Sequence, residues 1–400
     1  MAEFLELVES IEQERASVQK LFEGEGTGVH SKRGQANPTY MAKLAEAARL
    51  MADVQRGKRP TYLLREAMTT SDFPYLFGDI LDRQMLAAYQ EYPSTWRNWV
   101  RVKSVPDFRT VRRFPAALGT DSALSGVAEQ ADYPMASLTE VAPFTYAVTK
   151  YGRKVAFSWE ALINDELDAL KDVPVRLGRA ARRTEARFAT GLYCDSSGPH
   201  ASLYSNTYDN IVNTHAGASS TNPVLSIAAL QQAMLVLSKM DYTVDGTTEP
   251  IYVEAVNLVV PPALEVTALN ILNAVQLWLD TNASAGTAQQ NLVTVNWMRN
   301  RTRLWVDPYI PYVATSNGDT SWFLFANPDD RPALEIGFLR GHEQPEIFYK
   351  APNASRIGGG AVNPMEGDFE NDSVEYKVRH VLGGCRMDPL TTVASNGSGS

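Results

Sequence analysis

The sequence contains few cysteines and no long apolar run, and each absence argues against a class of protein. Cys194 and Cys385 are the only cysteines among 400 residues. They indicate a reducing compartment and two free thiols, with a disulfide between them as the alternative. No stretch approaches the roughly 20 apolar residues that cross a bilayer. The N-terminus is acidic and lacks the basic and apolar regions of a secretory signal. No membrane partner is therefore expected.

Basic residues are also in the minority. The chain has 37 Lys and Arg residues against 46 Asp and Glu residues, and the net charge of −9 disfavours nucleic-acid binding through charge alone. The five histidines show no metal-ligand spacing, and no Ser–His–Asp or Cys–His grouping stands out. We therefore expect no cofactor, no bound metal and no enzymatic activity. The chain is 44% hydrophobic and long enough for two hydrophobic cores.

A strand followed by two helices forms the most informative stretch. Residues 146–157 form two alternating sets in which β-branched and aromatic residues are frequent, which predicts a half-buried strand. Ser158 is placed to cap a helix that ends near Lys171. Asp172 can cap a longer second helix, and Pro174 falls in its first turn, where a missing N–H costs nothing.

The second helix is predicted to run from residue 173 to 193, roughly 30 Å. Its apolar residues recur at three- and four-residue steps and form one stripe. Another face carries a row of four arginines: Arg176, Arg179, Arg183 and Arg187.

This order of elements resembles the major capsid proteins of tailed phages, which have the Hong Kong phage-type fold. The segment AFSWEALINDELDAL and the PxxLGRAARRTEARF helix after it carry the resemblance, which extends over about residues 68–393. It implies an α+β fold with an N-terminal arm, an extended β-hairpin loop, a peripheral domain with a long spine helix, and an axial domain.

The resemblance also implies a division of the chain into segments. They are an N-terminal helical segment or arm at 1–67, its continuation with a further helix at 68–105, the extended loop at 106–150, the peripheral domain with the spine helix at 151–224, the axial domain at 225–332, strands returning to the peripheral domain at 333–394, and a flexible tail at 395–400.

Periodicity predicts elements elsewhere. Trp96 and Trp99 are expected in the core rather than in a ligand site. Helices are predicted at 1–22, from Pro38, within 69–92, from Ser226 and from Pro261 to Ala274, and strands at 251–260, 292–295, 303–306, 322–326, 333–339, 346–349 and 373–382.

Two strands, Phe108–Phe114 and Pro143–Thr149, are predicted to flank a long loop that makes sense if it packs on another subunit. Between residues 115 and 149 there is no Lys or Arg, whereas three arginines lie at the base. The acids are Asp121, Glu129, Asp132 and Glu140, and the base arginines are Arg109, Arg112 and Arg113. We expect the acidic tip to contact either the arginine row of the spine helix or the base of the next copy's loop. The alternative is a solvated surface loop.

One member of the family joins its subunits by a Lys–Asn bond from this loop. The loop here has no Lys before Lys150, so that cross-link is not expected.

The function implied by the resemblance is that of a tailed-phage major capsid protein. Such a protein forms hexamers and pentamers of an icosahedral shell that encloses double-stranded DNA without sequence-specific binding. Portal, scaffolding and cement proteins are further implied partners, and the location is the virion after assembly in the host bacterial cytoplasm. An encapsulin-type nanocompartment shell is the alternative within the same fold.

A hydrolase is the alternative from another class. It would use Asp165, in a helix that also carries Glu166 and Asp168, or Asp329, beside Asp330 in the segment NPDDRP. A solvated helix face and a turn explain these acids with fewer assumptions than catalysis does.

Overall fold

The computed structural model separates into two compact units. It describes residues 38–55, 58–59, 73–91, 93–114, 127, 129, 132, 144–158, 167–212, 222–244, 247–251, 253–274, 276–280, 291–299, 301–350 and 369–399. The first unit comprises Met1–Pro93, Lys150–Arg183 and Gln344–Val381, and the second comprises Ser94–Thr149, Thr184–Glu343 and Leu382–Ser400. No described helix is long and apolar enough to cross a membrane.

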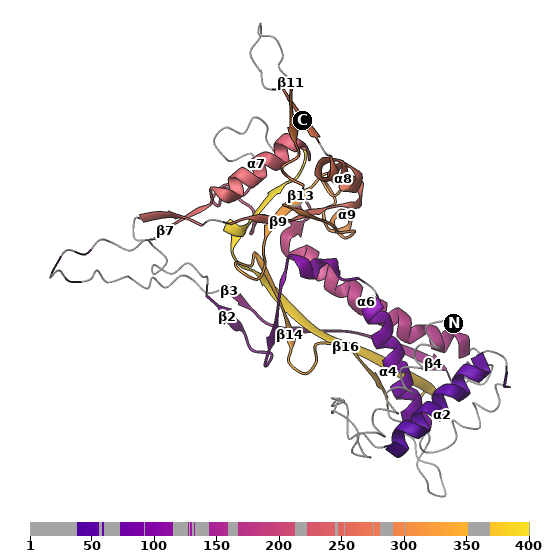
Figure 1. Cartoon of the computed structure of the whole chain (residues 1–400). Coiled ribbons are helices and arrows are strands. Elements are labelled where there is room, and N and C mark those ends of the chain that lie inside the picture. Colours follow the sequence, from indigo (N-terminus) through magenta and orange to yellow (C-terminus); the bar gives the residue numbers. More distant parts are fainter. Residues whose placement is uncertain are drawn as a thin grey trace, which may run out of the picture. The chain divides into compact units, whose positions relative to one another are not determined.

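The first unit packs helices against strands. Its elements are α2 (Pro38–Gln55), α4 (Phe73–Glu91), the first part of α6 (Leu167–Tyr193), β4 (Thr149–Ser158), β15 (Glu346–Tyr349) and β16 (Ser373–Arg386) (Figure 1). Both β4 and β15 pair with β16. The core includes Met85, Leu177 and Val378. A Cβ on Gly178 would overlap the Met85 carbonyl oxygen, so this glycine lets α6 approach α4 closely.

Two predictions for the stretch that contains β4 and α6 were wrong. The expected single strand at 146–157 is divided, because β3 (Phe144–Tyr146) pairs with β2 (Val111–Arg113) whereas β4 pairs with β16. The expected helix break near Lys171 and Asp172 is absent, since α6 continues from Leu167 through Pro174. The proline removes one backbone hydrogen bond, and α6 continues as a helix on both sides of it.

The second unit is built around a four-stranded sheet of order β12-β9-β13-β17. The strands are β9 (Ala255–Val260), β12 (Arg303–Val306), β13 (Trp322–Ala326) and β17 (Thr392–Ser395). β12 runs parallel to β9, and β13 runs antiparallel to both β9 and β17. All five residues of β13 are buried, as expected for a central strand covered on both faces.

Helices cover this sheet. α7 (Ile227–Ser238) begins at Ser226, whose side chain accepts a hydrogen bond from the Ala229 backbone N–H, as the sequence predicted. α7 contacts β9 and β17 (Figure 1). α8 (Glu265–Asn273) follows the 3₁₀ turn η3 (Pro262–Leu264). The remaining short elements are β5 (Cys194–Asp195), β6 (Gly198–Pro199), β7 (Asp241–Val244), β8 (Thr247–Pro250), β10 (Gln276–Asp280), β11 (Asn291–Val295), α9 (Ile310–Val313) and η5 (Pro389–Thr391).

A second ladder in this unit joins distant parts of the chain. β1 (Arg101–Val105), which sequence reasoning missed, runs parallel to β14 (Leu334–Leu339). The last residues of β16 pair antiparallel with the other edge of β14. Trp96 lies in η1 (Thr95–Asn98), and it and Trp99 are buried, which confirms their assignment to the core.

The expected flexible tail at 395–400 is wrong for its described residues. Ser395 is the last residue of β17, and its hydroxyl donates a hydrogen bond to the Pro223 carbonyl oxygen (2.8 Å). The Asn396 carbonyl oxygen accepts from the Thr320 hydroxyl (2.8 Å). Gly397 has a φ of +66°, which favours glycine. The polar composition therefore reflects a hydrogen-bonded strand end.

Candidate inter-subunit contact residues

The base of the extended loop is a short antiparallel ladder between β2 and β3. In its register Val111 lies opposite Tyr146, and Arg113 lies opposite Phe144. Because alternate residues of a strand share a face, Arg113 and Tyr146 project from the same side, whereas Arg112 projects from the other. The sequence predicted both strands, each longer than observed.

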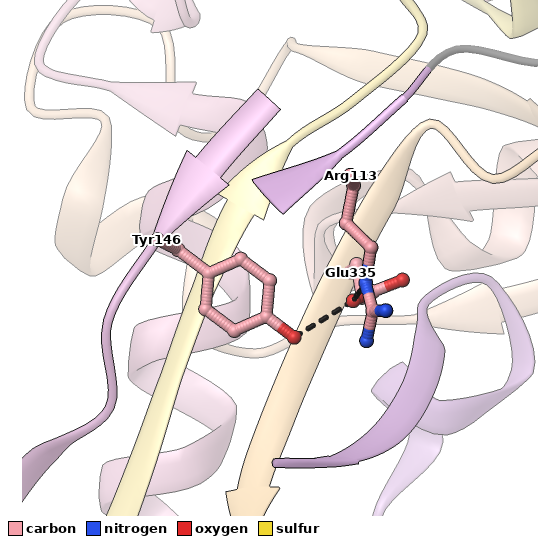
Figure 2. Close-up of polar contacts among 3 residues, drawn as sticks. All are labelled: Arg113, Tyr146 and Glu335. Atoms are coloured by element: carbon pink, nitrogen blue, oxygen red, sulfur yellow. Dashed lines mark hydrogen bonds and ion pairs between the residues drawn. The ribbon is translucent and has the colours of Figure 1, made fainter. Parts of the chain in front are cut away.

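Arg113 and Tyr146 converge on one carboxylate (Figure 2). The Arg113 Nε lies 2.6 Å from Glu335 Oε1, and the Tyr146 hydroxyl donates a hydrogen bond to the same oxygen (2.7 Å). The Glu335 side chain is 1% exposed and comes from β14. A Cβ on Gly337, two residues along β14, would lie 2.6 Å from the Tyr146 hydroxyl oxygen, so glycine makes room for the tyrosine.

The pKa shifts of Tyr146 and Arg113 agree with their contacts to Glu335. Burial, reinforced by the hydrogen bond to Glu335, raises the pKa of Tyr146 far above its ordinary range, so the tyrosine stays a proton donor. Burial alone would lower the pKa of Arg113, but the contacts with Glu335 outweigh it and raise that pKa. Arg113 is thus engaged within its own chain, where it ties the loop base to β14.

The other two base arginines are open to solvent. The Arg109 side chain is 91% exposed and lies 3.9 Å from Asp107, a distance at which an exposed pair contributes little. Arg112 is exposed on β2. Neither is engaged with a buried acid as Arg113 is, and their contact with a neighbouring copy stays a prediction.

The acidic residues of the loop are described only in part. Glu129 and Asp132 are exposed. Asp121 and Glu140 lie outside the described residues. Two loop acids and two base arginines are thus exposed among the described residues, and the contact expected between an acidic tip and a basic surface stays a prediction.

The arginine row of α6 divides into two groups. Arg176, Arg183 and Arg187 are exposed, and their spacing of seven and four residues places them on one side of the helix. Arg179 lies 3.2 Å from Glu91 of α4, so its charge is balanced by an exposed acid. Three of the four predicted arginines thus form an exposed stripe.

Sequence reasoning missed a buried arginine beside this stripe. The Nε of Arg182 donates a hydrogen bond to the Tyr89 carbonyl oxygen (2.6 Å), and its guanidinium lies 3.8 Å from the centre of the Tyr89 ring. Adjacent Arg182 and Arg183 differ by about 100° around the helix, which sends one inward and the other outward. The broad apolar stripe did not reveal which would be buried.

The end of α6 is held by an acid that the sequence gave no reason to single out. Asp307 accepts hydrogen bonds from the Thr190 and Tyr193 hydroxyls and from the Tyr309 backbone N–H. Burial raises the pKa of Asp307. Among the residues that the structure describes, no arginine or lysine lies within ion-pair distance of Asp307, and its hydrogen bonds anchor the last turn of α6.

Comparison with known proteins decides the family. A family model described as "Phage capsid protein" matches residues 141–395, more than half of the chain. The chain belongs to this family. It is a major capsid protein and hence a structural component of a phage shell, as the sequence resemblance implied.

Several solved structures are similar to this capsid protein at low identity. Gordonia phage Cozz matches at 13% identity and a TM-score of 0.40, with 74% of this chain and 83% of that chain covered. Microbacterium phage Oxtober96 matches at 10% identity and a TM-score of 0.42, covering 78% and 90%. The holo-SrpI encapsulin complex of Synechococcus elongatus PCC 7942 matches at 11% identity and a TM-score of 0.43, covering 78% and 94%. No curated protein sequence matches the chain. The phage assignment therefore rests on the family match.

The acids weighed for hydrolysis show no catalytic arrangement in the part of the capsid protein that is described. Asp165 and Glu166 lie outside it, and Asp168 lies in the first turn of α6. Asp329 is exposed in the turn after β13, where its backbone N–H donates to the Asn327 side chain. Among the residues searched, no group of three or more His, Cys, Asp or Glu side chains is placed to hold a metal.

Proposed function

We propose that this capsid protein assembles into hexamers and pentamers of an icosahedral shell that encloses a double-stranded DNA genome without reading its sequence. Assembly in the host bacterial cytoplasm, with portal, scaffolding and cement proteins as further partners, belongs to the same proposal. We assign the protein no catalytic activity. The family match carries the proposal, and the loop base anchored on β14 supports a mechanism for it.

Each unit has a mechanical role in this proposal. The sheet of β12, β9, β13 and β17, with α7 and α8, would act as the axial domain, whose copies meet at the centre of a hexamer or pentamer. The first unit, with its long helix α6, would act as the peripheral domain. Interfaces of permanent assemblies commonly bury more than about 2,000 Å², and mass action then stabilises the assembled form.

The proposed contacts between copies are electrostatic at the loop. Asp121, Glu129, Asp132 and Glu140 would meet basic residues of a neighbour. The predicted partners are Arg109 and Arg112 at the loop base and the exposed residues Arg176, Arg183 and Arg187 on α6. Complementary charges of this kind mainly set the register and speed of association. An acidic chain would also line the shell without holding the DNA tightly.

The first test is assembly of the purified chain, viewed by electron microscopy. Closed hollow particles are expected. Small soluble species with hydrolytic turnover would contradict the proposal, and particles that enclose protein rather than DNA in the producing cell would favour the encapsulin alternative.

The second test reverses the two exposed loop acids, Glu129→Lys with Asp132→Lys. We expect assembly to slow roughly tenfold at low salt, because like charges then approach one another. The matched control reverses Asp241 and Asp319, which are also exposed but lie outside the loop. An unchanged rate with unchanged salt dependence would contradict the proposed role of the loop acids.

A further inference from the structure

The second unit contains a basic cleft, a local reversal of charge in an acidic protein. The cavity has a volume of about 750 Å³. Four cations line it, and one acid, Asp329, joins them. The cations are Arg97 of η1, Arg101 and Lys103 of β1, and Arg303 of β12.

One of the four cations is already engaged. The Arg97 guanidinium lies 5.2 Å from the Trp96 ring centre and 5.6 Å from that of Phe338, and it is 3.8 Å from the buried carboxylate of Glu185. In contrast, no acidic group of the described residues lies within ion-pair distance of Arg101, Lys103 or Arg303. The cleft thus offers three positive charges without an internal partner.

The walls of the cleft are fixed before anything binds. Arg303 lies opposite Asn257 in the β9–β12 ladder. The Asn257 amide donates to the Asn98 carbonyl oxygen (3.1 Å) and accepts from the Trp305 indole N–H (2.9 Å), so it ties η1 to the sheet. Arg101 and Lys103 are held in register by β14. A preformed arrangement lowers the entropy that binding would cost.

We infer that this cleft binds the carboxylates of Glu129 and Asp132 from a neighbouring copy of the chain. The inference rests on the proposed shell function and identifies the surface of the neighbouring copy that the loop contacts. Residues 115–143 contain four acids and no Lys or Arg, so their charge complements the cleft. Glu129 and Asp132 are exposed and three residues apart, close enough to enter one cavity together.

The cleft is a better receiver than the arginine stripe of α6. Arg176 and Arg187 are eleven residues apart, about 16 Å along the helix, which is farther than the roughly 11 Å that three extended residues span. The cleft instead gathers Arg101, Lys103 and Arg303 around one cavity, so a single acidic segment can meet several cations at once. Nucleic acid is the less suitable occupant, because its phosphates extend along a line and favour basic stripes rather than a single cleft.

The first experiment exchanges the charges. Arg101→Glu with Lys103→Glu, and separately Glu129→Lys with Asp132→Lys, are each expected to reduce particle yield roughly tenfold. Combining all four is expected to restore the yield to within about twofold, since opposite charges face each other again. Lys239→Glu, at the exposed end of α7, is the control for a change of charge elsewhere and should assemble normally.

The second experiment is independent of yield. Particles carrying Lys103→Cys and Glu129→Cys are oxidised and run on a non-reducing gel. A ladder of cross-linked chains is expected if the loop enters the cleft. A disulfide forms only when the two Cα atoms approach within about 7 Å. Lys239→Cys with Glu129→Cys is the control and should remain monomeric on the gel.

The outcomes separate the two proposals. If the unmodified chain forms no shells, the proposed function fails. If shells form but the charge exchange restores nothing and the Cys pair gives only monomers, the receiver is elsewhere and this inference is overturned. Cleft variants that assemble normally but lose packaged DNA would also overturn it, in favour of a phosphate-binding cleft.

Discussion

The strand β13 and the next strand along the chain, β14, are both fully buried, yet they lie in different sheets and are held in different ways. Every residue of β13 is apolar. Burial of these side chains stabilises the core around the strand, and this hydrophobic stabilisation does not depend on direction. β14 carries the charged Glu335 at its second position, which Arg113 and Tyr146 satisfy. Hydrogen bonds and ion pairs depend on direction, so they fix the position of β2 and β3 as well as stabilising it. This suits the base of a loop that must leave the fold at a defined place.

Each region has a cysteine that can report on it, and both thiols are free. Cys194 follows Tyr193, whose ring packs edge-on against Phe323 and Phe325 of β13. Cys385 lies opposite Glu335 in the β14–β16 ladder. Burial raises the pKa of each thiol to about 12, so only roughly one thiol in 10⁴ is ionised at pH 8. Opening of either region should therefore speed labelling of its own cysteine.

The largest effect is expected from a cavity in β13. Leu324→Ala removes a side chain that lies between Leu258 and Val393 on the neighbouring strands. We expect the free energy of unfolding to fall by about 3 kcal/mol, measured by urea denaturation, with faster labelling of Cys194. Leu235→Ala, at an exposed position of α7, is the control and should change stability by less than about 0.5 kcal/mol. Equal losses for the two variants would show that β13 is not the core of its unit.

A smaller and more local effect is expected at the loop base. Glu335→Ala leaves the Arg113 guanidinium and the Tyr146 hydroxyl without their shared acceptor, at a cost of about 2 kcal/mol. Labelling of Cys385 should accelerate while that of Cys194 stays unchanged, and hydrogen exchange should rise at the amides of β2 and β3. Glu343→Ala, at an exposed acid nearby, should do neither. Equal acceleration at both cysteines would mean that the two regions open together.

Local signals in the sequence predicted many elements of both regions. The capping serine of α7 was found from its position before a periodic apolar run, and the strands β12, β13 and β15 were predicted with the observed bounds. The resemblance that led to the capsid family rested on the order of elements around α6. Such features depend on neighbours a few residues away, which periodicity and capping rules describe well.

The parts that sequence reasoning missed depend on distant partners. Arg113 and Glu335 are 222 residues apart, so nothing beside Arg113 indicated that it would be engaged within its own chain while Arg112 stayed exposed. β17 is four residues long, and its polar continuation is typical of a flexible tail until its pairing with β13 is known. The basic cleft likewise combines residues from η1, β1 and β12. Long-range pairing, rather than local propensity, fixed each of these features.

The smallest predicted effect comes from a variant at the loop base that loses a hydrogen bond but keeps its buried apolar surface. Tyr146→Phe removes only the hydroxyl, so the ring keeps its buried area while Glu335 loses one of two donors (Figure 2). Because Arg113 still balances the charge, we expect a loss of about 1 kcal/mol in urea denaturation, less than for Glu335→Ala. Tyr204→Phe is the matched control in the core, where the hydroxyl is hydrogen-bonded to Thr392 rather than to a charge. If Tyr146→Phe alone released Cys385 as fully as Glu335→Ala does, the tyrosine hydroxyl and not the ion pair would be what holds the loop to β14.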